Sequence, residues 1–139
     1  MTQNAPVRLG VVGHGTQGGT YARMIAAGDI EGMVLGAIAD TDESKREHAE
    51  TYGVPFFTDH RALIASGAVD AVVATVPHYQ HPEVAIDALE GGLHALAEKP
   101  AAVYAAEVRR MTEAAAAHPD LTYAIMFNQR TNPLYRRIK

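Results

Sequence analysis

The sequence contains no cysteine and no tryptophan, and only 6% of its residues are aromatic. The lack of cysteine excludes disulfide bonds and thiolate metal sites, and it suits the reducing cytoplasm in which we expect the protein to work. No apolar run reaches roughly 18 residues, so we expect neither a membrane-spanning helix nor a membrane partner. The net charge is −4 and basic residues do not cluster, which argues against nucleic acid as a partner.

Short apolar runs alternate with amphipathic helical stretches along all 139 residues, a length that suits one domain with a sizeable core. The expected strands are Val7–Val12, Met33–Ala39, Val54–Phe57, Ala71–Val76, Leu93–Ala97 and Leu121–Phe127. This alternation predicts an α/β fold, namely a doubly wound parallel sheet of the Rossmann type with strand order 3-2-1-4-5-6. Such sheets bind ligands at the carboxyl ends of strands one and four.

A glycine-rich segment directly follows the first expected strand, and a helical stretch follows the segment. Its residues are Gly13, His14, Gly15, Thr16, Gln17 and Gly18, which form the pattern Gly-x-Gly-x-x-Gly. Gly13 allows a tight turn, Gly15 lets a pyrophosphate approach the backbone, and Gly18 lets the helix pack close to the strand. These six residues are therefore predicted to bind a dinucleotide.

An acidic residue, Asp40, ends the second expected strand about 20 positions after Gly18. A carboxylate at this place accepts hydrogen bonds from both hydroxyls of the adenosine ribose and repels a 2′-phosphate. We therefore expect NAD rather than NADP as the cofactor. The alternative interpretation is a glycine-rich turn that binds no ligand.

Two histidines, His78 and His81, lie three positions apart in the loop after the strand Ala71–Val76. Neither cysteine nor a carboxylate cluster accompanies them, so we predict no metal site. Because Pro82 suits the first position of a helix, His81 is expected as the N-cap residue, close to the cofactor. His60 is expected at the surface.

Together, these segments resemble the N-terminal half of the Gfo/Idh/MocA oxidoreductases, a family that includes glucose–fructose oxidoreductase and inositol dehydrogenase. The similar pieces are residues 13–18, Asp40, Ala74-Thr75-Val76-Pro77 with His81, the run from Gly92 to Glu98-Lys99-Pro100, and Asn128-Gln129-Arg130 with Pro133. The resemblance implies an NAD-binding Rossmann domain over residues 1–128. Residues 129–139 would begin the connection to a second, α+β substrate domain that this chain lacks. In the family that domain also forms most of the oligomer interface, so the full-length protein is expected to be a homo-oligomer.

The resemblance also implies a reaction, which is hydride transfer between nicotinamide and a hydroxyl carbon of a sugar, cyclitol or related polyol. Such a reaction needs an acid/base group for the hydroxyl proton. Lys99 is the first candidate, in a neutral form favoured by the nicotinamide cation and partial burial, and His81 is the second. The remaining residues predicted to bind the cofactor are Thr75, Pro77, Glu98, Lys99 and Arg130.

Interpretations that give these residues no role in catalysis or cofactor binding also stay open. Lys99 could be a solvated lysine at a strand end, and Arg130 an exposed loop cation. Glu98 is expected either to orient its loop or to contact a ribose. For the whole chain, the alternatives are a non-catalytic dinucleotide-binding module, such as a redox sensor, and a Rossmann-like interaction domain without a ligand.

Overall fold

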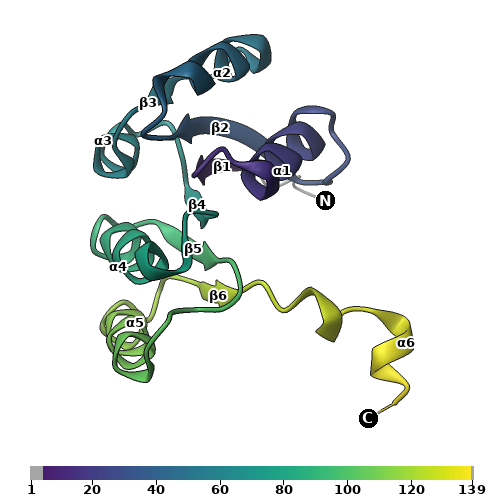
Figure 1. Ribbon diagram of the computed structural model, residues 1–139, viewed down its shortest axis with the longest axis vertical. Helices are drawn as coiled ribbons and strands as arrows, with labels where there is room; N and C mark the ends of the chain where they lie inside the picture. The colour runs from purple at the N-terminus through teal and green to yellow at the C-terminus, as the bar shows by residue number, and fades with distance from the viewer. Residues whose placement is uncertain (1–4, 139) are drawn as a thin grey trace.

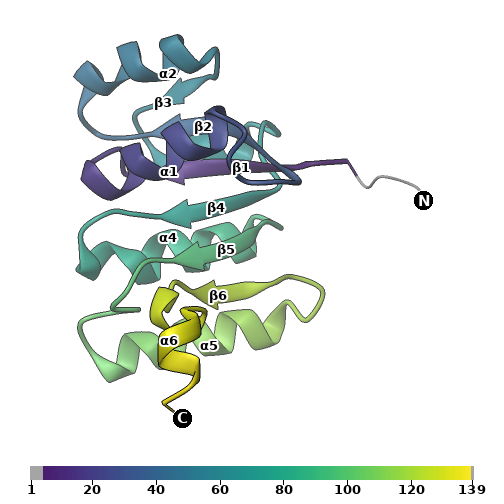
Figure 2. The ribbon, with the colours of Figure 1, turned by 90° about the vertical axis from the view of Figure 1, so that its right-hand side faces the viewer.

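A single sheet of parallel strands organises the computed structural model, which describes residues 5–138. The strand order is β3-β2-β1-β4-β5-β6, as Figures 1 and 2 show. The strands are β1 (Val7–Val12), β2 (Met33–Ala39), β3 (Phe56–Phe57), β4 (Ala71–Ala74), β5 (His94–Ala97) and β6 (Tyr123–Ile125). The predicted fold class and strand order are confirmed.

Helices cover both faces of this sheet (Figure 1). The α-helices are α1 (Thr16–Ala26), α2 (Arg46–Tyr52), α3 (His60–Ala65), α4 (His81–Glu90), α5 (Ala105–Ala117) and α6 (Pro133–Arg136). Short 3₁₀ turns at Glu43–Lys45, His78–Gln80 and Asn128–Arg130 precede α2, α4 and α6. None of the helices formed by residues 5–138 is long and apolar enough to cross a membrane.

The hydrophobic core is divided by the sheet into two layers. Neighbouring residues of a strand point to opposite faces, so Val72 packs on the side of α3, α4 and α5, whereas Val73 packs on the side of α1 and α2. Both valines are almost completely buried. Burial on two faces explains why β4 and the buried part of β1, from Leu9 to Val12, are continuous apolar runs without polar alternation.

The start of α4 differs from the prediction for His81. Gln80 donates its backbone N–H to the Pro77 carbonyl at 2.8 Å, and this turn leads directly into the helix. His81 therefore already has helical backbone angles, φ −52° and ψ −45°, and Gln80 takes the cap position. The N-cap prediction for His81 is wrong, and the His81 side chain is directed into the interior, where it is 1% exposed.

After β6 the chain leaves the sheet and ends in α6, away from the rest of the fold (Figure 1). The Asn132 side chain caps α6 by accepting the Leu134 N–H at 2.9 Å. Leu134, Tyr135 and Ile138 are exposed. Residues 1–4 of the predicted Rossmann domain and residue 139 of the predicted connecting segment lie outside the described residues.

Candidate functional site

The glycine segment forms a tight turn between β1 and α1. Gly13 has φ +92°, and a Cβ on it would lie 2.8 Å from the Thr75 backbone. A Cβ on Gly18 would lie 1.9 Å from the Gly13 carbonyl oxygen. A Cβ on Gly15, in contrast, would meet no atom of residues 5–138 within 4 Å outside its own chain neighbours. The turn therefore requires Gly13 and Gly18, whereas the position of Gly15 is open toward solvent and leaves room for a ligand.

The amino end of α1 faces this open space. Gly15 is the N-cap residue, and among the residues described no side chain caps the helix or places an acidic charge in its first turn. Gly15, Thr16 and Gln17 are exposed, so their N–H groups are accessible. Free N–H groups and the helix dipole favour an anion at this place. A dinucleotide pyrophosphate fits both the charge and the space.

Asp40 lies at the carboxyl end of β2 beside the same turn. Its Oδ2 accepts the His14 backbone N–H at 2.6 Å, and its Oδ1 accepts the Asp42 backbone N–H at 2.9 Å. These two bonds fix the plane of the carboxylate. Each oxygen keeps a lone pair for a further donor, as a pair of ribose hydroxyls would require.

The ring of His14 does not take part in this arrangement. It is 5% exposed and packs edge-on against the rings of His48 and Tyr52, at centroid distances of 5.1 and 6.5 Å. Burial, and secondarily the charge of His48, lower the pKa of His14. Its Nδ1 finds no hydrogen-bond partner among residues 5–138. The structure therefore offers the cofactor the backbone of His14 and keeps its side chain in the α1–α2 layer.

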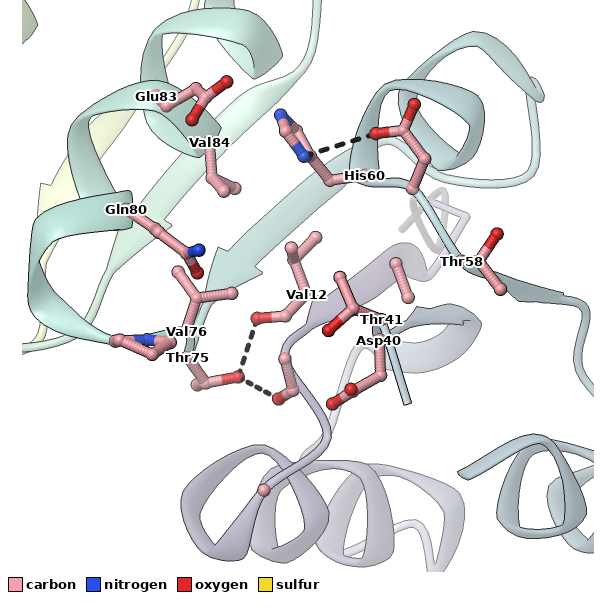
Figure 3. A pocket seen from close by; sticks show the side chains of 15 residues that line it. Val12, Asp40, Thr41, Thr58, His60, Thr75, Val76, Gln80, Glu83 and Val84 are labelled. Atoms are coloured by element: carbon pink, nitrogen blue, oxygen red, sulfur yellow. Dashed lines mark hydrogen bonds and ion pairs between the residues drawn. The ribbon is translucent and has the colours of Figure 1, made fainter. Parts of the chain in front are cut away.

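A cavity of about 280 Å³ opens beside Asp40, at the carboxyl ends of β1, β2 and β4 (Figure 3). The predicted site residues Gly13, Gly15, Asp40, Thr75 and Pro77 line it. Residues that the sequence analysis did not assign to the site also line it; these are Val12, Ala39, Thr41, Thr58, Asp59, His60, Val76, Gln80, Glu83 and Val84. The structure thus collects the first group of predicted residues around one cavity.

Thr75 connects the two central strands at this cavity. Its hydroxyl lies 3.0 Å from the Val12 carbonyl oxygen and 2.5 Å from that of Gly13 (Figure 3). A hydroxyl carries one proton, so it donates to one of these carbonyls at a time. Thr75 therefore stabilises the backbone at the start of the glycine turn.

His60 belongs to the wall of the cavity, and the prediction that it lies at the surface is wrong. Its Nε2 lies 2.8 Å from Asp87, and its side chain is 15% exposed. Arg61 pairs with Asp87 at 2.9 Å and with Glu83 at 2.5 Å. Although atoms of His60, Glu83 and Asp87 could approach a metal ion, the Arg61 guanidinium already pairs with both carboxylates. We therefore interpret this cluster as an ion-pair network.

The second group of predicted residues follows β5. Glu98 is 8% exposed, and its Oε1 accepts a hydrogen bond from the Tyr21 hydroxyl of α1. Its Oε2 accepts the Lys99 backbone N–H at 2.9 Å. Burial, reinforced by the hydrogen bond to Glu98, raises the pKa of Tyr21 to about 12. Glu98 therefore orients its own turn, which is one of the two roles expected for it.

Tyr21 was not among the predicted site residues. The spacing of Tyr21, Met24 and Ile25 at i, i+3 and i+4 predicts only that Tyr21 lies on the apolar face of the first helix. A signal was nevertheless present. A tyrosine on a buried face brings a hydroxyl with it, and buried hydroxyls need a hydrogen-bond partner. The sequence therefore indicates that the Tyr21 hydroxyl needs a partner, but it does not identify Glu98 as that partner.

Lys99 itself is exposed, so the described residues do not supply the partial burial that we expected for it. The peptide bond from Lys99 to Pro100 is cis. Both residues border a second cavity of about 500 Å³, together with Met126, Phe127, Asn128, Gln129 and Arg130. Arg130 lies at this cavity and places its guanidinium 5.6 Å from the centre of the Phe127 ring. Among the predicted site residues, Lys99 and Arg130 thus lie at this second cavity, apart from those at the first.

Both ring nitrogens of His81 face backbone carbonyl oxygens, and a neutral ring donates to one of them at a time. Its Nδ1 lies 2.8 Å from the Pro100 carbonyl oxygen, and its Nε2 lies 2.9 Å from that of Val76. A buried ring whose two nitrogens both face backbone carbonyls is not placed to exchange a proton with a substrate, contrary to the catalytic role predicted for His81. The ring instead ties the loop after β4 to the turn that carries Lys99.

Comparison with known proteins agrees with this geometry. The sequence model of the Gfo/Idh/MocA family, described as an oxidoreductase family with an NAD-binding Rossmann fold, matches residues 7–125. Inositol 2-dehydrogenase 1 of Saccharopolyspora erythraea is 37% identical over 108 residues, which are 76% of this chain and 32% of that protein. Inositol 2-dehydrogenase 4 of the same organism is 32% identical over 138 residues, which are 98% of this chain and 40% of that protein.

Solved structures show the same similarity. Myo-inositol 2-dehydrogenase from Lactobacillus plantarum superposes with a TM-score of 0.88 at 30% identity, over 96% of this chain and 40% of that chain. Scyllo-inositol dehydrogenase from Lactobacillus casei, with bound NAD(H) and scyllo-inositol, superposes with a TM-score of 0.90 at 25% identity, over 96% of this chain and 39% of that chain. The chain thus spans two fifths or less of the length of these relatives. Its fold, its glycine turn and the family match over residues 7–125 agree, and the chain belongs to the Gfo/Idh/MocA oxidoreductases, of which it forms the NAD-binding Rossmann fold.

Proposed function

We propose that this chain is the cofactor-binding part of an NAD-dependent dehydrogenase that oxidises a hydroxyl carbon of a cyclitol, sugar or related polyol. The observation that carries the proposal is the open space at Gly15 in front of the uncapped end of α1. The names of the relatives, which are inositol dehydrogenases, support a cyclitol as the substrate.

In this proposal the residues near the glycine turn bind the cofactor, and the Lys99 turn faces its reacting end. The N–H groups of Gly15, Thr16 and Gln17 bind the pyrophosphate, and Asp40 accepts hydrogen bonds from the adenosine ribose. The cavity beside Asp40 receives the adenine, since it continues from the ribose site and has partly apolar walls. Lys99 and its turn then face the reacting end of the cofactor.

The nicotinamide, when bound, supplies the hydride acceptor. Lys99 is the acid/base group for the proton of the substrate hydroxyl, and its Nζ accepts that proton in the neutral form, which a bound nicotinamide cation would favour. Glu98 binds only the backbone N–H of Lys99, which leaves the side chain free. His81 acts as a positioning residue, because its ring holds the carbonyl of Pro100 next to Lys99.

We expect the chain to bind NAD more tightly than NADP, by at least about 10-fold, because the Asp40 carboxylate would repel a 2′-phosphate. The two nearby cations are already engaged. Lys45 lies 4.0 Å from Asp42, and Arg46 pairs with Glu43 at 2.5 Å while stacking on Phe56.

The ratio of the two dissociation constants, measured by calorimetry, tests this preference. Asp40→Ser should bring the ratio close to one, whereas Asp120→Ser, at an exposed position outside the site, should leave it unchanged. NADP binding as tight as NAD binding in the unsubstituted chain would refute the assignment of Asp40.

Two measurements test the proposed function as a whole. Calorimetry should detect NAD binding by the 139-residue chain, which should turn over little substrate. The intact natural protein should reduce NAD with a cyclitol such as myo-inositol or with a related polyol. Binding without turnover by the intact protein would favour the redox-sensing alternative, and a lack of binding would favour a domain without a ligand.

We further propose the division at residue 128, with the Rossmann domain before it and the start of a connecting segment after it. The match over residues 7–125 and the exposed course of residues 128–138 support this division. Homo-oligomerisation of the intact protein and its place in the cytoplasm stay predictions.

A further inference from the structure

The turn that carries Lys99 is held by a side chain from the other half of the sheet. Tyr21 extends from α1, packs in the same hydrophobic layer as Leu96 of β5, and donates its hydroxyl to Glu98. Tyr21 lies between one and two helical turns after Thr16, where the exposed amino end of α1 begins. One helix thus carries both the anion site and the anchor of the Lys99 turn.

Glu98 depends on this bond because it is a buried carboxylate without a cation. Within residues 5–138 no ion pair joins Glu98 to a basic side chain. A buried carboxylate is costly unless hydrogen bonds replace its water. Its two oxygens have one donor each, the Tyr21 hydroxyl and the Lys99 backbone N–H. Each donor therefore fixes where the carboxylate points.

The Tyr21 hydroxyl stays protonated and so remains a hydrogen-bond donor to Glu98. Burial and the neighbouring carboxylate raise the pKa of Tyr21 to about 12, so it keeps its proton throughout the range in which dehydrogenases work. Without that hydroxyl, Oε1 of Glu98 would have no donor. The nearest cation along the chain is the Lys99 ammonium, and its capture by Glu98 would remove it from the substrate.

We propose that Tyr21 is a positioning residue for proton transfer: by holding Glu98, it keeps the Lys99 turn in place and the Lys99 amine free. This inference rests on the proposed function of Lys99. It goes further because it assigns a role to a residue of α1 and connects the phosphate-binding helix to the acid/base turn.

Tyr21→Phe in the intact natural protein tests the inference and keeps the ring that packs in the core. We expect kcat with a cyclitol to fall about 10-fold, since small misplacements of an acid/base group are costly. The KM and dissociation constant for NAD should change less than about 2-fold. Tyr123→Phe is the matched control and should leave kcat unchanged. Within residues 5–138 the half-buried Tyr123 hydroxyl has one hydrogen-bond partner, the sulfur of Met111 at 3.6 Å.

A second readout is amide hydrogen exchange in the 139-residue chain. Tyr21→Phe should speed exchange of the Lys99 amide about 10-fold, while the amide of Val72 in β4 serves as the reference for the whole fold. Unchanged kcat would overturn the inference. A loss of kcat with unchanged Lys99 exchange would also overturn it, because Tyr21 would then not act through Glu98.

Lys99→Ala in the same assay separates this inference from the proposed function. If Lys99→Ala retains full activity, the proposed role of Lys99 fails. If Lys99→Ala loses activity while Tyr21→Phe retains it, only the role of Tyr21 fails.

Discussion

Replacing Gly15 with valine should abolish dinucleotide binding, by at least about 100-fold in the dissociation constant, while the domain stays folded. Gly15 has φ −76° and ψ −158°, which a residue with a side chain also adopts. Apart from its two chain neighbours, a Cβ at this position would meet no part of residues 5–138 within 4 Å, so the valine side chain would extend into the open space that we assign to the pyrophosphate. Calorimetry with NAD and the thermal unfolding midpoint measure the two effects separately.

Two other glycines provide contrasting controls. A Cβ on Gly19 would lie 3.8 Å from the His14 ring, so Gly19→Ala should retain both fold and binding. Gly18→Ala should destabilise the domain, because its Cβ would lie 1.9 Å from the Gly13 carbonyl oxygen. Parental NAD affinity in a folded Gly15→Val variant would show that the glycine turn is not the phosphate site.

Lys99→Ala in the intact natural protein should lower the maximal rate by about 10²–10⁴-fold, the usual contribution of a positioned acid/base group. NAD affinity should change little, since the exposed Lys99 side chain leaves the pyrophosphate and ribose sites intact. The loss should fall on the chemical step. The deuterium isotope effect at the oxidised carbon should therefore persist or increase.

A matched control for the lost charge is Arg110→Ala on the exposed side of α5, which should keep the maximal rate. Full activity of the Lys99→Ala protein would return Lys99 to a surface role. Proton transfer would then pass to the exposed His78, because the buried ring of His81 faces backbone carbonyls with both nitrogens.

Much of the fold could be predicted because its signals are local. β1 and β2 have the predicted bounds, since each is a short apolar segment between clear end signals. The strand order was expected from the doubly wound Rossmann arrangement as a whole rather than from any single residue. β3 is shorter than expected because Pro55 has no N–H to offer the ladder.

The contacts that define the site could not be predicted in the same way. Tyr21 and Glu98 are 77 positions apart, and His81 and Pro100 are 19 apart. A periodic pattern gives the face on which a residue lies, but not its partner on another element. The predictions that His60 lies at the surface and that His81 caps a helix were wrong for this reason. The turn role of Gly13 and the packing role of Gly18 depend on neighbouring backbone and were correctly predicted.

The strand order places the proposed site residues on two halves of the sheet. The glycine turn and Asp40 belong to the β3-β2-β1 half, whereas Lys99 belongs to the β4-β5-β6 half. The preference between NAD and NADP, which we assign to Asp40, can therefore change without the proposed acid/base turn. An enzyme engineer could exchange the loop after β2 and keep Thr75 and Pro77, which line the same cavity from the β4-β5-β6 half. Tyr21 limits this freedom, because a graft that includes α1 must also bring the tyrosine that Glu98 requires.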